Sequence, residues 1–191
     1  MARKTKIAVF ASGSGSNFTA IEEACRNGEL NAEIALVVTN KPEAYVVERA
    51  EKAGIPVAAF RPKDYASREL YEAAILESLH EVEAEWLVLA GYMRLVGSTL
   101  LAAYPSRIVN IHPSLLPSFP GKDAIGQAIE HGVKVTGVTV HLVDEGMDTG
   151  PILAQHAVEV VDGDVEKTAE AIHAVEHFLY KDTLSELFSR S

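Results

Sequence analysis

The feature that most constrains the fold is the alternation of short apolar segments with longer amphipathic ones. Short apolar segments fit strands buried on both faces, whereas apolar residues spaced every three or four positions predict helices. In the first half, strands are expected at residues 6–11, 34–38, 56–60 and 86–90, with helices at 18–27, 44–53 and 71–82. This order predicts an α/β protein whose parallel sheet is covered by helices on both faces.

The second half keeps the alternation but changes its character. We expect a strand at 107–111, a proline-rich loop at 112–121, a short helix at 124–131, strands at 133–143 and 152–161, and a last helix at 165–188 with Ile172, Val175, Leu179 and Leu187 on its apolar side. The two late strands alternate more, which predicts an antiparallel pair at one edge. The length of 191 residues, without repeat or linker, predicts a single domain over residues 1–191 with an open, mostly parallel sheet.

Composition restricts the partners. A formal net charge of −10 provides no basic face for nucleic acid. The longest uncharged apolar segment, 86–93, is too short to span a membrane, and the five apolar residues at 7–11 are too few for a secretory signal. Cys25 is the only cysteine, which excludes an intramolecular disulfide and a cysteine-based zinc site. We therefore expect a cytoplasmic protein that binds neither nucleic acid nor membrane.

A loop of small residues, Ser-Gly-Ser-Gly-Ser-Asn at 12–17, lies where the first strand meets the first helix. Small residues let backbone N–H groups approach an anion, and the helix dipole favours negative charge there. A dinucleotide-binding loop would need Gly or Ala at Phe18 and an acidic residue near Asn40, and a P-loop would need Gly-Lys-Ser/Thr. The loop therefore suits a phosphate monoester on a sugar. Alternatively, Ser16 and Asn17 are only turn and N-cap residues.

The most informative segment is Asn-Ile-His-Pro-Ser-Leu-Leu-Pro at 110–117. Strand alternation places Asn110 and His112 on the same side of the expected strand, at the carboxyl end where ligands bind in open α/β sheets. An amide and an imidazole can donate to an oxygen that becomes negative as a carbonyl is attacked, and His112 can also carry a proton near neutral pH. A structural role for His112 remains the alternative.

A second loop, Asp-Glu-Gly-Met-Asp-Thr-Gly-Pro at 144–151, carries three carboxylates between the two late strands. They can be solvated turn residues, or one can lie beside His112 and favour its protonated form. A metal site built from His112, His141, Asp144 and Asp148 is disfavoured because the spacing matches no metal motif.

Together with Gly-Tyr-Met-Arg at 91–94, these motifs resemble the phosphoribosylglycinamide formyltransferases, folate-dependent enzymes of purine biosynthesis. The resemblance extends from Ile7 to about Tyr180. It implies a Rossmann-like formyltransferase fold, with ribonucleotide binding in the N-terminal half and folate binding and catalysis in the C-terminal half. The 110–117 motif is shared by the wider formyl-tetrahydrofolate group, whereas the 12–17 loop is particular to this family.

The resemblance also implies a role for each matching residue. The catalytic trio would be Asn110, His112 and Asp148. Glycinamide ribonucleotide would be bound by Gly15, Ser16, Asn17 and Glu176. The co-substrate 10-formyltetrahydrofolate would be contacted by Arg68, Met93, Arg94, Leu95, Val96, Asn110 and Asp144, with loop 144–148 around the pterin, and no metal is required. Other readings stay open: Met93 as a core residue, Arg68 as a solvated one and Glu176 as an exposed charge.

The implied reaction moves the formyl group directly to the amine of the ribonucleotide through a tetrahedral intermediate. The main alternative is formyltetrahydrofolate hydrolase, which would use the same trio on water and usually carries an extra N-terminal regulatory domain that this sequence lacks. Methionyl-tRNA formyltransferase is longer and is disfavoured by the acidic charge. A dinucleotide-binding module would leave the trio unexplained. A homodimer is left open.

Overall fold

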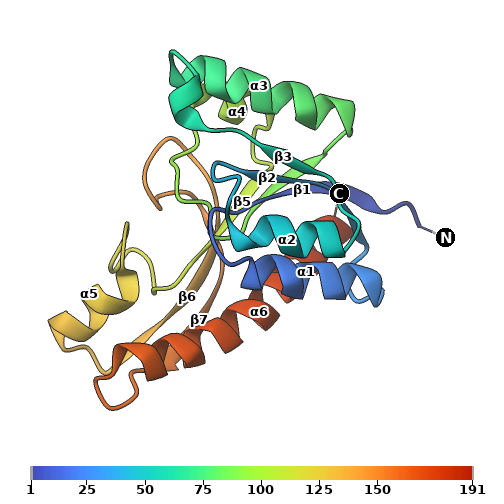
Figure 1. Ribbon diagram of the computed structural model, residues 1–191. Helices are drawn as coiled ribbons and strands as arrows, with labels where there is room; N and C mark the ends of the chain where they lie inside the picture. Colours follow the sequence, from blue (N-terminus) through green and yellow to red (C-terminus); the bar gives the residue numbers. More distant parts are fainter. Residues whose placement is uncertain (1, 191) are drawn as a thin grey trace.

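The computed structural model describes residues 2–190, which form one seven-stranded sheet between two layers of helices (Figure 1). The strands are β1 (Thr5–Phe10), β2 (Ala32–Thr39), β3 (Val57–Ala59), β4 (Trp86–Leu89), β5 (Ile108–His112), β6 (Val135–Leu142) and β7 (Ile152–Glu159). Their order is β3-β2-β1-β4-β5-β6-β7, in which the first five are parallel. Strand β6 pairs antiparallel with both β5 and β7. The predicted α/β class, the parallel sheet and the antiparallel edge are confirmed.

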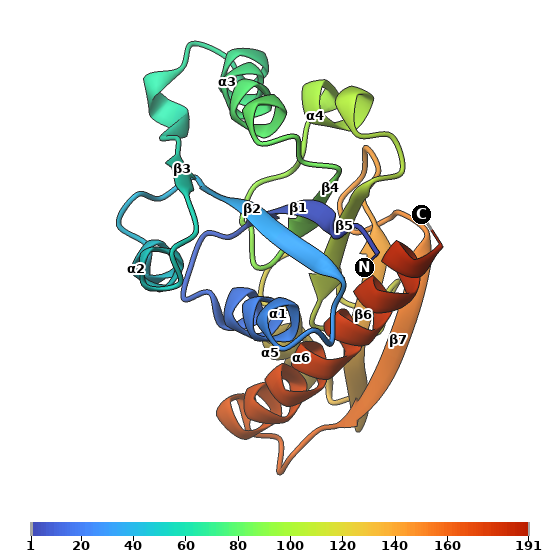
Figure 2. The same cartoon turned by 90° about the vertical axis from the view of Figure 1, so that its right-hand side faces the viewer.

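The helices cover both faces of this sheet. They are α1 (Ser16–Arg26), α2 (Tyr45–Lys52), α3 (Arg68–Glu81), α4 (Ser98–Ala103), α5 (Ala124–His131) and α6 (Val165–Ser189). Helices α3 and α4 lie on one face, and α1, α2 and α6 lie on the other (Figure 2). The sequence pattern did not predict α4 or the 3₁₀ turn Pro62–Asp64. These elements have six and three residues, respectively, which are too few to display a helical period.

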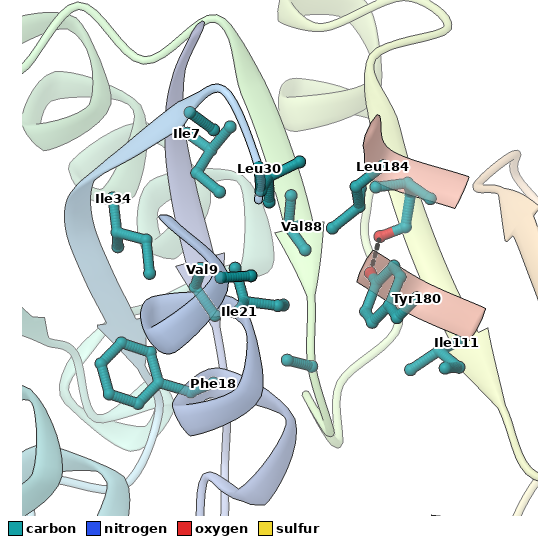
Figure 3. Close-up of a cluster of buried hydrophobic side chains, with 14 of the residues drawn as sticks. Ile7, Val9, Phe18, Ile21, Leu30, Ile34, Val88, Ile111, Tyr180 and Leu184 are labelled. Carbon is teal, nitrogen blue, oxygen red and sulfur yellow. Dashed lines mark hydrogen bonds between the residues drawn. The ribbon is translucent and has the colours of Figure 1, made fainter. Parts of the chain in front are cut away.

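Two apolar cores, one on each face, explain why the parallel strands are apolar throughout. In β1, Ile7 and Val9 face the layer of α1, α2 and α6 (Figure 3), whereas Ala8 and Phe10 face α3 and α4. All four side chains are fully buried. A strand with helices on both faces has no solvent side, so neither face of it can be polar.

Helix α6 buries a different set of residues from the one predicted. Ile172 is buried as expected, but Val175, Leu179 and Leu187 are only partly buried against the core. Buried positions recur four apart along the helix: Thr168, Ile172, Glu176, Tyr180, Leu184 and Phe188. The buried side of α6 differs from the predicted one because Glu176 and Tyr180, which carry polar groups, were not expected in the core. The single hydroxyl hydrogen of Tyr180 is shared between the carbonyl oxygens of Leu89 at 2.7 Å and Val109 at 3.1 Å, which ties α6 to β4 and β5.

The strand order creates a crevice at the carboxyl ends of β1 and β4. From β1 the chain moves outward through β2 to β3, and it then returns to form β4 on the other side of β1. The loops that follow β1 and β4 therefore leave in opposite directions, and ligands bind at such a point in open α/β sheets. Within residues 2–190, no helix has the length and apolar character needed to cross a membrane.

Candidate active site

A cavity of about 560 Å³ occupies this crevice. Its walls are the loop 13–17 after β1, the segment 91–96 after β4, the end of β5, the loop 121–125, the loop 146–148 and the inner side of α6. Segments far apart in the sequence therefore meet where the topology predicts a ligand.

The residues of the expected catalytic trio converge in this cavity. Asn110 and His112 lie on one side of β5, and Asp148 reaches them from the loop between β6 and β7. The Oδ2 atom of Asp148 lies 3.5 Å from Nδ1 of His112, and the backbone N–H of Gly121 donates to the same oxygen at 2.8 Å. Asp148 adopts a left-handed backbone conformation with φ 56°. The carboxylate is thus directed at the imidazole by its backbone and by a neighbouring loop.

Both ring nitrogens of His112 have partners. Nε2 lies 2.8 Å from the carbonyl oxygen of Phe119, and because a carbonyl can only accept, Nε2 carries a proton. Nδ1 faces Asp148. The His112 side chain is only 7% exposed, so both contacts are shielded from water.

His141 is a site residue whose position the sequence did not reveal. It lies opposite Asn110 across the β5–β6 pair. Its Nδ1 bonds the carbonyl oxygen of Leu142 at 2.8 Å and therefore carries a proton. Its Nε2 is then free to accept from the Asn110 amide, 3.3 Å away, which orients that amide. Strand register decides this contact, and register could not be read from the two segments separately.

The loop 13–17 begins α1. Gly15 is the N-cap residue of that helix and has φ 79°, a conformation that glycine adopts without strain. A Cβ on Gly15 would lie 2.7 Å from Cγ2 of Val46 in α2, so this glycine is needed for packing. Gly13 has open space around its missing Cβ and is exposed at the cavity wall. The room for a ligand is therefore at Gly13 rather than at Gly15.

Glu176 is buried, which rules out the alternative that it is an exposed charge on the surface of the helix. Its Oε2 accepts from Nδ2 of Asn17 at 3.1 Å, which joins the first loop to the last helix. Burial raises the pKa of the Glu176 carboxyl, while the Asn17 bond and the charges of His173 and His112 act in the opposite direction. Among the described residues, the buried Oδ1 of Asn17 has no donor. Asn17 and Glu176 therefore offer acceptors to hydroxyl or amine hydrogens of a ligand.

The segment 91–96 forms an apolar wall of the cavity. Met93 is 64% exposed and Leu95 39% exposed, so Met93 is not a core residue. Val96 is buried behind them, and the Arg94 guanidinium lies over the Tyr71 ring, 5.1 Å from its centre. Exposed apolar side chains beside a cation suit a ligand that has a flat ring and an acidic end.

Two of the expected binding residues do not line the cavity. Arg68 is exposed at the start of α3. Asp144 is bonded within its own loop by the Thr149 hydroxyl at 2.7 Å and the Gly146 N–H at 3.0 Å. The Thr149 bond is the largest cause of a lowered pKa at Asp144. Asp144 thus shapes the loop that carries Asp148.

Within residues 2–190, no group of three or more His, Cys, Asp or Glu side chains is arranged to hold a metal ion. His141, a member of the disfavoured metal set, bonds Asn110 and a backbone carbonyl. Its Nε2 also lies 3.8 Å from Oδ1 of Asp148.

An amide, an imidazole and a carboxylate at the switch point of an open α/β sheet are the components of an enzyme that acts on a carbonyl group. The family model described as "Formyl transferase" matches residues 5–184. The chain therefore belongs to the formyl transferase family and is a transferase.

Similar proteins narrow the comparison. The chain is 55% identical, over 95% of its length, to 94% of the phosphoribosylglycinamide formyltransferase of Bacillus subtilis. It is 41% identical, over 97% of its length, to a part comprising 14% of the trifunctional purine biosynthetic protein adenosine-3 of Drosophila melanogaster.

Solved structures agree. The phosphoribosylglycinamide formyltransferase of Bacillus halodurans superposes with a TM-score of 0.94 at 56% identity, covering 97% of this chain and 96% of that one. Glycinamide ribonucleotide transformylase 1 of Geobacillus kaustophilus gives the same TM-score at 55% identity, with 97% and 99% covered. The resemblance to the phosphoribosylglycinamide formyltransferases within this family is confirmed.

Proposed function

We propose that this enzyme transfers the formyl group of 10-formyltetrahydrofolate to the amine of glycinamide ribonucleotide, a step of purine biosynthesis. The observation that carries the proposal is the meeting, in one cavity, of the trio Asn110, His112 and Asp148 with a helix N-terminus suited to a phosphate. The relatives' names support this choice of substrates.

Ribonucleotide binding is assigned to one side of the cavity. Backbone N–H groups at the start of α1 favour the phosphate through the helix dipole. The acceptors on Asn17 and Glu176 suit the hydroxyls or the amine of the same substrate. We assign Gly15, Ser16, Asn17 and Glu176 to this substrate, with Gly15 acting through the shape of the loop.

Folate binding is assigned to the other side. The exposed side chains of Met93 and Leu95 provide an apolar surface for a pterin, and Val96 supports them from behind. Arg94 supplies positive charge, and the half-buried Asn110 lies at the boundary of both subsites. Asp144 acts by holding loop 144–148 in shape. Arg68 is retained as a contact for the acidic end of the folate, outside the cavity proper.

Catalysis is assigned to the trio. The amine nitrogen attacks the formyl carbon, a C–N bond forms, and the formyl oxygen becomes negative. Asn110 and the Nε2–H of His112 donate hydrogen bonds to that oxygen. For Nε2 of His112 to take part, the developing oxyanion replaces the Phe119 carbonyl as its acceptor. The carbonyl bond then re-forms as the bond from the formyl carbon to N10 breaks. The proton that the attacking amine loses reaches N10, carried by His112 or by a water near Asp148. Nothing in this route requires a metal.

The proposed location is supported by the single cysteine, whose reduced thiol suits a reducing compartment. Burial raises the pKa of the single cysteine, Cys25, to about 11, so its thiol stays protonated and unreactive near neutral pH. We propose a cytoplasmic enzyme of one domain, active with small-molecule substrates. A homodimer is compatible with this proposal.

One experiment separates transfer from hydrolysis. The purified protein is incubated with 10-formyltetrahydrofolate, with and without glycinamide ribonucleotide, and tetrahydrofolate and formylated ribonucleotide are quantified. We expect formyl loss that requires the ribonucleotide and equals the product formed. Equal loss without the ribonucleotide would identify a formyltetrahydrofolate hydrolase, which remains the alternative because the same trio can act on water.

A further inference from the structure

Ser12 lies outside the cavity lining, yet it joins the two walls that bind different substrates. It directly precedes the ribonucleotide loop 13–17, and its backbone N–H donates to the carbonyl oxygen of Gly91, 3.0 Å away, at the start of the folate segment 91–96. Its hydroxyl oxygen accepts from the backbone N–H of Met93 at 2.9 Å. Ser12 is 3% exposed, so no water competes freely for these bonds.

The same hydroxyl is anchored at a third strand end. Its O–H donates to Oδ1 of Asn40, 2.5 Å away, directly after β2. Asn40 sits in a turn that is itself fixed, because the Thr39 hydroxyl accepts from the N–H of Lys41 at 3.1 Å. A chain of hydrogen bonds therefore runs from Met93 through Ser12 to Asn40, across the carboxyl ends of β4, β1 and β2. Each bond in such a chain polarises the next.

We propose that Ser12 is a positioning residue that holds the folate segment 91–96 in register with the ribonucleotide loop, with Asn40 orienting its hydroxyl. This inference rests on the proposed function, since it assigns the two segments to the two substrates. It also gives Asn40 a role at the position where a dinucleotide-binding protein would carry an acidic residue.

The physical reason is the lack of a substitute partner. Without the hydroxyl, the Met93 N–H and the Asn40 carbonyl oxygen lose their bonds in a half-buried place. An unmade hydrogen bond of this kind costs about 1–1.5 kcal/mol, which corresponds to about tenfold in affinity. The loss falls on segment 91–96, because loop 13–17 keeps its own bonds, such as the one from the Val46 N–H to the Gly13 carbonyl.

The test compares Ser12→Ala with the wild type in steady-state kinetics. We expect the KM for 10-formyltetrahydrofolate to rise about tenfold, while kcat and the KM for glycinamide ribonucleotide change less than about threefold. Hydrogen exchange followed by NMR is expected to show faster exchange of the Met93 amide in the variant. The matched control is Thr183→Ala, which removes a buried hydroxyl bonded within α6 and is expected to alter neither quantity.

A second pair of variants covers the case in which Ser12→Ala does not fold. Asn40→Ala removes the acceptor and is expected to raise the folate KM by a smaller factor. Asn40→Asp keeps an acceptor oxygen and is expected to stay near the wild-type KM. An unchanged folate KM in both alanine variants, or an equal rise in the two KM values, overturns the inference alone. A wild-type protein without ribonucleotide-dependent transfer overturns the proposed function, and the inference with it.

Discussion

Asp148 and His112 are 36 positions apart in the sequence, but the half-buried carboxylate meets the buried imidazole, with Oδ2 3.5 Å from Nδ1. The other ring nitrogen of His112 donates to the Phe119 carbonyl at 2.8 Å. The imidazole is therefore held between a carboxylate that fixes its orientation and an acceptor that a substrate oxygen can replace. This arrangement leads directly to two predictions about catalysis.

Replacing Asp148 by Asn keeps the size of the side chain and removes its charge. The acceptor oxygen that faces Nδ1 of His112 can then be replaced by an NH2 group, which cannot accept a hydrogen bond from the ring. We expect formyl transfer to fall strongly, because the carboxylate no longer holds the imidazole in its orientation. Steady-state kcat measures this effect, with Asp182→Asn, an exposed change on α6, as the control. An Asp148→Asn protein with the kcat of the wild type would reduce Asp148 to a loop-shaping residue.

Replacing His112 by Ala removes the Nε2–H donor while both walls of the cavity remain. We expect kcat to fall by about two to four orders of magnitude, with modest changes in the two KM values. Single-turnover and steady-state kinetics measure this, and His80→Ala, exposed near the end of α3, serves as the control. Turnover close to the wild-type value would contradict a catalytic role for His112.

The two glycines of the first loop should respond differently to substitution. A methyl group at Gly13 enters open space at the cavity wall, so Gly13→Ala is expected to raise the KM for the ribonucleotide several-fold while the melting temperature is kept. Gly15→Val places its branched side chain against Val46 and at a positive φ, so it is expected to lower the melting temperature. Calorimetry and substrate titration separate the effects. A Gly15→Val protein as stable as the wild type would contradict the packing argument.

Glu176 predicts a dependence of stability on pH. Its folded-state pKa is raised by burial, so the native protein holds this proton more tightly than the unfolded chain. Stability from this group is complete below the unfolded value near 4.5 and is lost as pH rises through the raised pKa. Glu176→Gln is expected to flatten this decrease and to raise the KM for the ribonucleotide, because an NH2 group replaces one acceptor oxygen beside Asn17.

Urea unfolding between pH 4.5 and 8 measures the slope, with the exposed Glu170→Gln in the same helix as the control. A Glu176→Gln protein whose stability falls with pH as steeply as the wild type would show that Glu176 is ionised equally in both states.

Local pattern was enough for most of the elements. The apolar runs that became β1, β2 and β4 are apolar because helices cover both faces, and burial of this kind leaves its mark on every residue of a strand. Helix α4 shows no comparable sequence pattern, because its six residues make fewer than two turns. Its N-terminal N–H at Gly97 donates to Glu72, a buried carboxylate 25 positions earlier, which no local pattern indicates.

The sequence by itself determined the fold class and the chemical groups of the site, because hydrophobic periodicity and short motifs are local properties of the chain. Only the tertiary structure decided how those groups are paired. Strand register placed His141 opposite Asn110, and the four-residue spacing of α6 turned Glu176 inward to Asn17. The tertiary structure also leaves Arg68 and Asp144 outside the cavity lining. Such pairings depend on packing between segments that are distant in sequence. The sequence of one segment does not show which other segment it will contact.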